Sequence, residues 1–265
     1  MESDENSGGA MVLVERQADV VTITLNRPNQ FNALSEELLG ALANALNHVR
    51  TDTSVRCVIL GAAGKAFCAG HDLREMRSKP SLDYYRALFT KCCGVMQSIQ
   101  SLDVPVIARV HGLATAAGCQ LVASCDLAFA AQSARFAVSG INVGLFCSTP
   151  AVALSRNVSR KRAFEMLVTG RFVDASVAAE SGLVNAVVPD ESLDSVIAGK
   201  VCEIVSKSPA AIRHGKYMFY RQLEMPLTEA YAFAGEVMAQ NMMEDDASEG
   251  INAFLEKRLP TWGAH

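Results

Sequence analysis

Short apolar segments alternate with segments of helical periodicity along this chain, and that alternation constrains its fold more than any other feature. Val12–Arg16 and Val20–Asn26 are rich in β-branched residues and predict two strands joined by a short turn. A helix is predicted after Ser35, a candidate N-cap, because apolar residues between Leu38 and Val49 recur at helical spacing. Later strands are predicted at Cys57–Leu60, Val104–Val110 and Asp126–Ala131, with a helix at Asp83–Leu102 before the second of them.

Strands that alternate with helices in this rhythm pair in parallel through crossover connections, and the helices pack outside the sheet. The chain is therefore predicted to be an α/β protein. From Thr149 onward the pattern is almost wholly helical, with stops at glycines and prolines. We expect a disordered tail at 1–10, an α/β core at 11–200 and a helical region at 201–265.

Composition and charge argue against several classes of function. Hydrophobic residues make up 50% of the chain, which is enough for a large core, and the net charge of −4 argues against nucleic acid as a partner. No apolar run reaches the roughly 18–20 residues needed to span a membrane. The opening residues lack the features of a signal peptide and the arginines of a mitochondrial transit peptide, so a cytoplasmic protein is expected.

Eight cysteines raise the question of disulfides or a metal site. They form no C-x-x-C pair and the histidines are scattered, so no metal site is predicted. Several of the cysteines lie in or beside apolar runs, where a reduced thiol packs as a small hydrophobic group. We interpret most of them as packing residues in a reducing compartment.

Two turns of small residues, at 61–73 and 111–120, each precede a helix. Neither is a nucleotide-binding loop, because Gly64-Lys65-Ala66 lacks the glycine spacing and the hydroxyl of a phosphate loop, and neither turn contains G-x-G-x-x-G. Both offer backbone N–H groups at helix starts, where small side chains let a ligand approach. Two such groups from separate turns can bind one developing oxyanion. Each turn alone is also compatible with ordinary packing of a helix on a strand.

The two turns lie within longer motifs, Lys65–Leu73 (KAFCAGHDL) and Val110–Asp126 (VHGLATAAGCQLVASCD). Shorter motifs accompany them: LNRP at 25–28, NAL at 32–34, LVTG at 167–170, AAESGLV at 178–184 and EGINAFLEKR at 249–258. In this order they resemble the enoyl-CoA hydratase/isomerase, or crotonase, superfamily over nearly the whole chain. Within the superfamily, the motif detail is most similar to the group of enoyl-CoA hydratase domain-containing protein 3.

The resemblance implies a spiral of β-β-α units that forms two near-perpendicular sheets, followed by a C-terminal helical trimerisation region. Homotrimers or dimers of trimers are the assemblies it implies. The substrate would be an acyl-CoA thioester, with coenzyme A entering as part of the substrate and no separate cofactor. The thioester carbonyl would accept hydrogen bonds from the backbone N–H groups of His71 and Ala117.

The same resemblance implies that the adenine and pantetheine of coenzyme A lie along Lys65–Arg74. Arg74 would match a lysine that contacts phosphate, and Lys257 would match a lysine that reaches a CoA phosphate, often on a neighbouring subunit. A solvated surface charge is the alternative interpretation of both. The CoA-binding residues implied in this way are Lys65, Phe67, Ala69, Gly70, Asp72, Leu73, Arg74 and Lys257.

The sequence departs from the family at the two glutamates with which its hydratases handle the proton of water and the proton of Cα. Gln120 stands at the first position, and Gly140, counted from Phe136, stands at the second. Between Pro105 and Phe164 the one carboxylate is Asp126, whose position indicates a structural role. A positioned general acid or base is worth roughly 10²–10⁴ in rate, so efficient hydration is not expected. The backbone oxyanion donors would remain.

Three side chains are candidate substitutes for the missing glutamates. His71 could titrate near neutrality, unless its side chain points away while its N–H binds the substrate. Cys147 lies on the segment that borders the acyl pocket in the family, but no histidine partner is visible, so a pocket-lining thiol is favoured over a nucleophile. Gln120 would orient a water molecule or hold the acyl group, with plain packing as the alternative.

Three functions are compatible with these residues. The first is an acyl-CoA enzyme that does not use two glutamates and passes through an oxyanion, as decarboxylation and thioester hydrolysis do. The second is a non-catalytic acyl-CoA-binding protein or assembly partner, and the third is a weak hydratase. Family membership predicts the fold and the ligand class but does not decide among these reactions.

Overall fold

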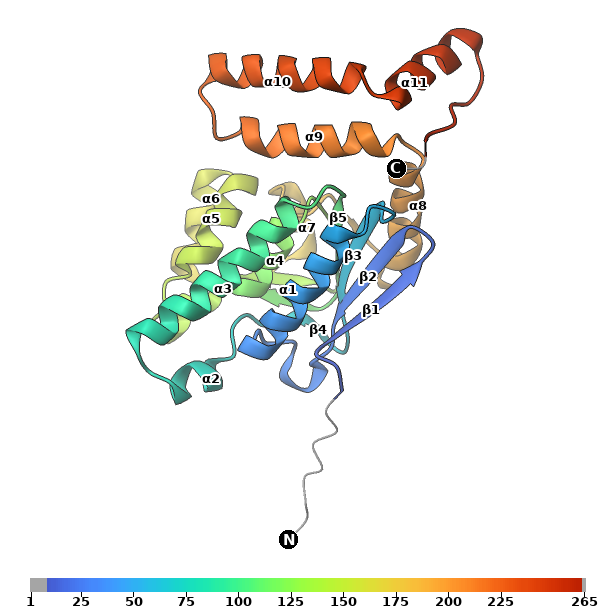
Figure 1. Cartoon of the computed structure of the whole chain (residues 1–265). Coiled ribbons are helices and arrows are strands. Elements are labelled where there is room, and N and C mark those ends of the chain that lie inside the picture. Colours follow the sequence, from blue (N-terminus) through green and yellow to red (C-terminus); the bar gives the residue numbers. More distant parts are fainter. Residues whose placement is uncertain (1–8, 264–265) are drawn as a thin grey trace.

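The computed structural model describes residues 9–263. The tail predicted at 1–10 therefore lies outside the described residues except for Gly9 and Ala10. The α/β fold predicted from the sequence is confirmed: two sheets, a layer of helices around them and a pair of long helices at one end make up the chain (Figure 1).

The larger sheet has six strands, which are parallel except for the antiparallel first pair. Val21, Ile23 and Leu25 alternate with more exposed residues in the second strand, which is the period expected for a strand with one buried face. In sheet order the strands are β1 (Val12–Gln17), β2 (Val20–Leu25), β3 (Cys57–Ala62), β5 (Val106–Val110), β7 (Leu127–Ala131) and β10 (Ala186–Val188).

The smaller sheet has four strands, and none of them was expected from the local pattern. Its strands have two or three residues each, too few for a period of two to be recognised. The last strand of this sheet, at 173–174, and β10 of the larger sheet lie after Thr149, where the chain was expected to be almost wholly helical. In sheet order the strands are β4 (Ala66–Cys68), β6 (Leu113–Thr115), β8 (Arg135–Ala137) and β9 (Val173–Asp174).

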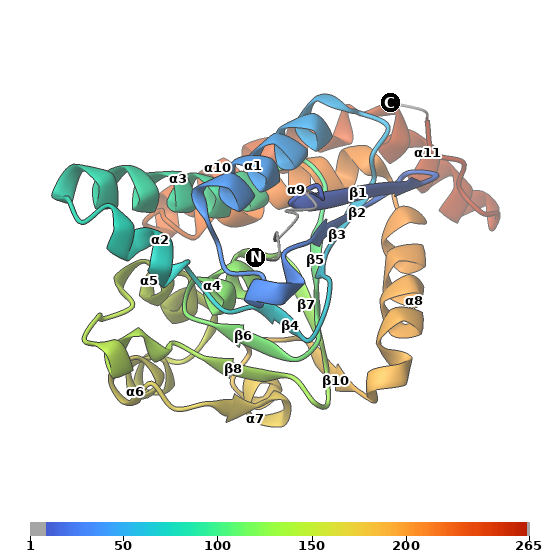
Figure 2. The ribbon, with the colours of Figure 1, turned by 90° about the horizontal axis from the view of Figure 1, so that it is seen from below.

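Helices cover both faces of the larger sheet (Figure 2). The predicted cap of the first helix is confirmed, because the hydroxyl of Ser35 accepts a hydrogen bond of 3.1 Å from the N–H of Leu38. The α-helices are α1 (Glu36–Thr51), α2 (Leu73–Ser78), α3 (Leu82–Gln100), α4 (Ala117–Ser124), α5 (Ser148–Asn157), α6 (Arg160–Thr169), α7 (Ala175–Glu180), α8 (Leu193–Val205), α9 (Pro209–Gln222), α10 (Leu227–Met242) and α11 (Asp245–Glu256). Three 3₁₀ turns are η1 (Pro28–Gln30), η2 (Ser139–Val143) and η3 (Asp190–Ser192).

The core is divided by the larger sheet. Val58 and Leu60 of β3 belong to the large apolar cluster shared with α1, α3 and α4, whereas Cys57 belongs to a smaller cluster with Ile197 and Val201 of α8. Successive residues of one strand thus face opposite helices. The turns that were singled out in the sequence follow β3 and β5, two central strands of the larger sheet.

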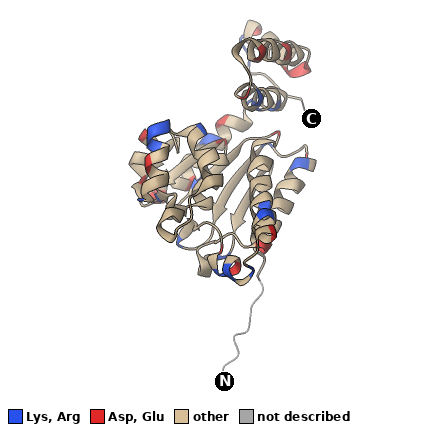
Figure 3. Ribbon diagram, turned by 90° about the vertical axis from the view of Figure 1, so that its left-hand side faces the viewer, with Lys and Arg blue, Asp and Glu red and all other residues tan. Residues whose placement is uncertain are grey.

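The last three helices form an arm beyond the core (Figures 1 and 3). On α9, the ammonium group of Lys216 donates a 2.7 Å hydrogen bond to Asp126 and the hydroxyl of Tyr220 donates one of 2.8 Å to the same carboxylate. Asp126, which precedes β7, therefore fastens the arm to the sheet, as its predicted structural role requires. The boundary expected at residue 200 falls inside α8, which packs on the larger sheet. Across residues 9–263, no helix is long and apolar enough to cross a membrane.

Candidate active site

In the turn after β4, the backbone N–H of His71 makes no hydrogen bond to another backbone group among the described residues. The N–H of Leu34 donates to the carbonyl of Gly70 at 2.7 Å, and the N–H of Asp72 donates to the carbonyl of Leu34 at 3.2 Å. Leu34 and His71 thus form a parallel bridge in which the neighbours of His71 make both hydrogen bonds. In such a bridge the N–H of His71 itself points away from Leu34.

The second turn presents the N-terminus of α4. Ala117 is the first residue of that helix, and the first N–H groups of a helix have no partner within it. The preceding residue, Ala116, has φ 49° and ψ −119°, a conformation that favours glycine. The carbonyl of Ala137 in β8 accepts the N–H of Ala116 at 2.9 Å and helps hold this strained turn.

The two turns are packed directly on each other. The hydroxyl of Thr115 donates a 2.9 Å hydrogen bond to the carbonyl of Ala69. A Cβ added to Gly118 would lie 2.1 Å from the carbonyl oxygen of Cys68, and one added to Gly70 would lie 3.4 Å from the nitrogen of Ala117. Glycine at both positions therefore allows the backbones of the two turns to approach. This arrangement brings together His71 and Ala117, the two residues implied as oxyanion donors.

A cavity of about 240 Å³ opens beside these turns, between α2, α3, α4 and the segment from η2 to α5. His71 and Cys147 are the titratable side chains among the residues that line it within the described chain, and neither a carboxylate nor a cation is among them. Its apolar side chains are Leu73, Met76, Phe89, Val143, Leu145 and Phe146, and the remaining residues of its wall are Ala69, Ala116, Ala117, Ser139, Gly140, Ser148, Thr149 and Pro150.

Two side chains, His71 in the cavity wall and Gln120 in α4, carry buried polar atoms that make no hydrogen bond of ordinary geometry among the described residues. Both ring nitrogens of His71 and the amide oxygen of Gln120 are shielded from solvent and unpaired. Burial lowers the pKa of His71 and outweighs the opposing effect of the Leu34 backbone on the imidazole, so the ring is neutral at pH 7. Gln120 lies in the first turns of α4, where 4% of its surface is exposed, and it is not among the described residues that line the cavity. The structure therefore does not place this predicted site residue in the cavity wall, although its buried amide oxygen is costly to leave unpaired.

Gly140 and Cys147 meet across the segment between η2 and α5. The N–H of Gly140 donates to the sulfur of Cys147 at 3.3 Å. Burial raises the pKa of this thiol, and the hydrogen bond from Gly140 opposes that effect only partly. A raised pKa keeps the thiol protonated at neutral pH, and Cys147 is among the residues that line the cavity.

The residues expected along the CoA path divide into two groups. Ala69, Gly70 and Leu73 lie at the turn or the cavity, and Lys65 and Arg74 flank the same segment with exposed side chains. The others do not present a free side chain there. Phe67 is fully buried in the core. Asp72 accepts hydrogen bonds from the backbone of α2 and pairs with Arg27. Lys257 follows the last residue of α11, at the far end of the molecule from α2 (Figure 1).

Two residues that support the site were given no role in the sequence analysis. The side chain of Asn32 is fully buried, accepts the N–H of Arg27 and donates to the carbonyls of Ala63 and Ala66, each at 2.8 Å. Arg27 in turn pairs with Asp72 at 2.8 Å. Both residues stand in the LNRP and NAL motifs, so the signal was present, but its meaning depends on contacts between segments distant in the sequence.

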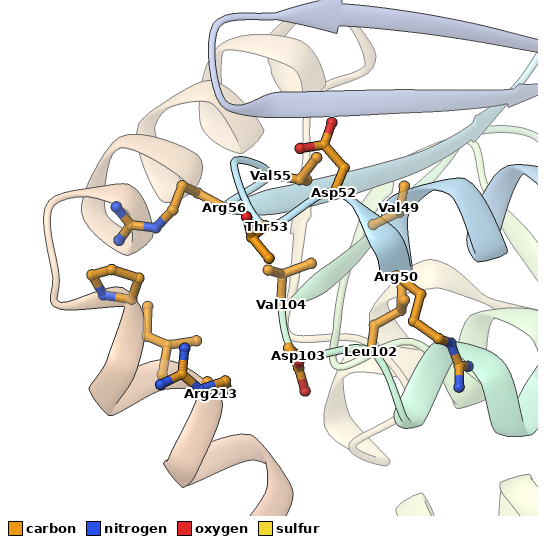
Figure 4. A pocket seen from close by; sticks show the side chains of 12 residues that line it. Val49, Arg50, Asp52, Thr53, Val55, Arg56, Leu102, Asp103, Val104 and Arg213 are labelled. Atoms are coloured by element: carbon orange, nitrogen blue, oxygen red, sulfur yellow. The ribbon is translucent and has the colours of Figure 1, made fainter. Parts of the chain in front are cut away.

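A second pocket, of about 130 Å³, is lined by several charged residues and lies where α9 meets the core (Figure 4). Its arginines are already engaged: Arg50 donates to Ser101, Arg56 to the carbonyl of Lys207, and Arg213 to Glu244. This pocket is therefore a junction between the arm and the core.

Among the described residues, no group of three or more His, Cys, Asp or Glu could hold a metal ion.

The fold and this site define the chain as a member of the enoyl-CoA hydratase/isomerase family, whose model matches residues 15–265. Enoyl-CoA hydratase domain-containing protein 3, mitochondrial, of Xenopus laevis is 45% identical over 95% of this chain and 86% of its own length. The human protein of the same name is 44% identical over 93% of this chain and 82% of its own length. These similarities confirm the family and the group that the motifs indicated.

Solved structures agree with the assignment. An enoyl-CoA hydratase of Mycobacterium smegmatis superposes with a TM-score of 0.94 and 62% identity, covering 95% of this chain and 98% of that one. Human enoyl-CoA hydratase domain-containing protein 3 superposes with a TM-score of 0.92 and 42% identity, covering 95% and 100%. The crotonase fold is thereby confirmed.

The expectation of a cytoplasmic protein is wrong by this comparison, because the names of the Xenopus laevis and human relatives point to mitochondria.

Proposed function

We propose that the cavity binds the acyl group of a coenzyme A thioester, with the thioester oxygen held by the N–H groups of His71 and Ala117. The parallel bridge between Leu34 and His71 is the observation that carries this proposal, because it turns the N–H of His71 away from Leu34. The second donor is at the N-terminus of α4, whose dipole also favours a negative oxygen.

Two fixed donors of this kind stabilise an enolate or a tetrahedral oxyanion. Each such donor is worth about 10²–10³ in rate in enzymes where it has been removed. The cavity wall formed by the described residues contains no carboxylate, and Gln120 and Gly140 stand at the positions of the hydratase glutamates. We therefore favour a reaction through an oxyanion that needs no pair of carboxylates, such as decarboxylation or thioester hydrolysis, with at most weak hydration.

The coenzyme A moiety would follow the segment Lys65–Arg74, where the charges of Lys65 and Arg74 are exposed and free for phosphate. Lys257 is remote from this segment within one chain, so its proposed contact with a CoA phosphate requires a neighbouring copy in a homotrimer or a dimer of trimers. Numerous apolar side chains exposed on α9, α10 and α11 support such an assembly. No cofactor beyond the coenzyme A of the substrate is proposed.

A non-catalytic acyl-CoA-binding protein or assembly partner is the alternative function. The absence of carboxylates from the cavity wall among the described residues is the observation in its favour.

Binding and turnover of a panel of enoyl-, malonyl-, methylmalonyl- and saturated acyl-CoA thioesters would test the proposal. The decisive change is an ester in place of the peptide bond before Ala117, introduced by semisynthesis, because it removes the N–H and leaves the side chains of Ala116 and Ala117 unchanged. The semisynthetic protein with the ordinary peptide bond is the matched control, since it retains the N–H. We expect the ester to lower the turnover by about 10²–10³ relative to that control. Binding without turnover of any thioester would favour the alternative, and absence of binding would contradict both.

A further inference from the structure

His111 follows β5, and its half-buried imidazole contacts the turn that precedes Lys65. The Nε2 atom of the ring lies 2.9 Å from the carbonyl oxygen of Gly64. The Nδ1 atom lies 3.2 Å from Nη1 of Arg109. Both ring nitrogens therefore have a partner, and one partner belongs to the segment along which coenzyme A is proposed to lie.

The neighbours of this imidazole determine which of its nitrogens carries the proton. A guanidinium group offers only N–H donors, so Nδ1 of His111 has to accept the hydrogen bond from Arg109. The proton of the neutral ring is then on Nε2, which donates to the carbonyl of Gly64. Arg109 is itself fixed by a two-point ion pair with Asp194 in the first turn of α8. Three side chains in a row thus connect α8 to the turn.

The turn is held by side chains from two separate segments. The amide of Asn32 donates to the carbonyls of Ala63 and Ala66, each at 2.8 Å. His111 holds the carbonyl of Gly64, which lies between them in the chain. Gly64 has φ 82°, and glycine leaves the backbone free to adopt other conformations unless its neighbours hold it. The hydrogen bond from His111 therefore restricts the most adaptable residue of the turn.

The backbone of Lys65 is enclosed on the same side. A Cβ added to Gly112 would lie 2.1 Å from the carbonyl oxygen of Lys65, so the residue after His111 packs directly on this backbone. Lys65 itself is exposed. Its ammonium group is thus carried by a backbone that is already ordered, which reduces the entropy lost when the group binds a phosphate.

We propose that His111 is a positioning residue for coenzyme A, which holds the carbonyl of Gly64 so that Lys65 is presented to the phosphates of the ligand. This inference rests on the proposed function, in which the coenzyme A moiety follows Lys65–Arg74. His111 is not among the described residues that line the acyl cavity. Its contribution therefore concerns the affinity for the nucleotide part of coenzyme A and not the affinity for the acyl group.

Titrations at pH 8 with butyryl-CoA and with S-butyryl-pantetheine, which lacks the nucleotide and its phosphates, test this role. We expect His111→Ala to raise the Kd for butyryl-CoA by about three- to tenfold and the Kd for S-butyryl-pantetheine by less than about 1.5-fold. His111→Gln should stay within about twofold of wild type for both, because one amide can accept from Arg109 and donate to Gly64. His48→Ala is the matched control, since His48 also bonds a backbone carbonyl but lies exposed on α1.

A double-mutant cycle shows whether the effect passes through Lys65. In a Lys65→Met background the phosphate contact is gone, so His111→Ala should change the Kd for butyryl-CoA by less than about twofold. An undiminished effect of His111→Ala in that background would overturn the proposal.

The outcomes separate this inference from the function on which it rests. Failure of the wild-type protein to bind butyryl-CoA would overturn both. Binding by wild type, with affinities for the two thioesters that are equally reduced or unchanged in His111→Ala, would overturn the role of His111 alone. Should His111→Ala fail to fold, the ¹⁵N shifts of the wild-type ring, assigned with His111→Gln, decide the matter. An Nε2–H tautomer at pH 8 whose shifts change on saturation with butyryl-CoA supports the proposal, and an Nδ1–H tautomer or unchanged shifts contradict it.

Discussion

The backbone N–H of Gly140 donates a hydrogen bond of 3.3 Å to the sulfur of Cys147. This contact joins Gly140, which we predicted from the sequence to stand at the position of a hydratase glutamate, to a side chain of the cavity wall. A Cβ added to Gly140 would lie 2.8 Å from that sulfur and 2.5 Å from the carbonyl oxygen of Leu145. The segment from η2 to α5 thus occupies space that a side chain at residue 140 would need. A side chain at residue 140 therefore requires this segment to move.

Gly140→Ala is expected to destabilise the protein by about 1–3 kcal/mol, because the added methyl group meets a backbone carbonyl that has to shift. Urea denaturation measures the change. Gly94→Ala is the matched control: Gly94 is inside α3, a Cβ there meets nothing within 4 Å, and alanine should stabilise the helix by roughly 0.5–1 kcal/mol. Equal stability of Gly140→Ala and wild type would show that the segment adapts freely.

Restoring both glutamates is expected not to restore hydration. In the double variant Gln120→Glu with Gly140→Glu, the second side chain cannot enter the site unless the carbonyl of Leu145 and the thiol of Cys147 move. Hydration of crotonyl-CoA, followed by the loss of its enoyl absorbance, should stay within about tenfold of wild type, far below the roughly 10⁴ expected for two positioned groups. A gain of that larger size would contradict the packing argument.

The sequence was most informative where a pattern repeats over several residues. The strands from β1 to β7 of the larger sheet and the Ser35 cap could be predicted because apolar runs and a capping residue act locally. The strands of the smaller sheet could not, because strands as short as Val173–Asp174 owe their conformation to their neighbours. Periodicity also could not show that Phe67, inside a binding motif, faces the core.

The candidate site was predicted as motifs, but its geometry depends on contacts between them. The resemblance named His71 and Ala117, yet the direction of the His71 N–H follows from its bridge with Leu34. Likewise, Asp72 was expected at the CoA path, whereas in the structure it caps α2 and pairs with Arg27. Such roles join segments far apart in the sequence, and a single sequence does not show which segments meet.

Gln120→Leu is expected to raise stability while it lowers turnover of the thioester. The amide oxygen of Gln120 is buried without a partner among the described residues, and an unpaired buried group of this kind costs about 1–3 kcal/mol. Leucine has a similar size and removes that cost. Thermal unfolding and turnover measured on the same preparation test both effects. If Gln120→Leu were destabilising, the side chain would be making a structural hydrogen bond.

Cys147 is expected to resist alkylation at pH 7.5. Burial raises the pKa of its thiol, so the thiolate forms only above the ordinary range, whereas Cys202 is exposed on α8. Iodoacetamide should modify Cys202 at least about tenfold faster than Cys147, as judged by mass spectrometry of peptides. In denaturant the two rates should converge. Preferential labelling of Cys147 in the native protein would instead identify it as an activated nucleophile.

Asp126→Asn is expected to cost about 3–5 kcal/mol, because it leaves the ammonium group of Lys216 buried without a carboxylate. The double variant with Lys216→Met should recover much of this loss, since no unpaired charge remains. Asp83→Asn is the control: its ion pair with Arg86 is exposed and worth less than about 1 kcal/mol. Denaturant titration compares the variants, and a small effect of Asp126→Asn would show that α9 is held by apolar packing instead.

The carboxylate of Asp72 is expected to make the free energy of unfolding depend on pH in the acid range. Partial burial raises the pKa of its carboxyl group, but the hydrogen bonds from Arg27 and from the N–H groups of Glu75 and Arg74 outweigh burial and lower it overall. The unfolded chain therefore binds the proton at a higher pH than the folded chain does. The stabilisation is complete above the unfolded pKa of about 3.9 and is lost as the pH falls through the folded pKa.

Two variants separate the charge of Asp72 from its capping role. Asp72→Asn keeps an oxygen that can cap α2 but loses the ion pair with Arg27. Asp72→Ala loses both the cap and the ion pair, so it should lower the free energy of unfolding by about 0.5–2 kcal/mol more than Asp72→Asn does. Because α2 places Met76 in the cavity wall, Asp72→Ala should also weaken acyl-CoA binding more than Asp72→Asn. Denaturation between pH 3 and 7 and titration with butyryl-CoA measure the two effects. Equal affinities of the two variants would show that the cavity does not depend on the α2 cap.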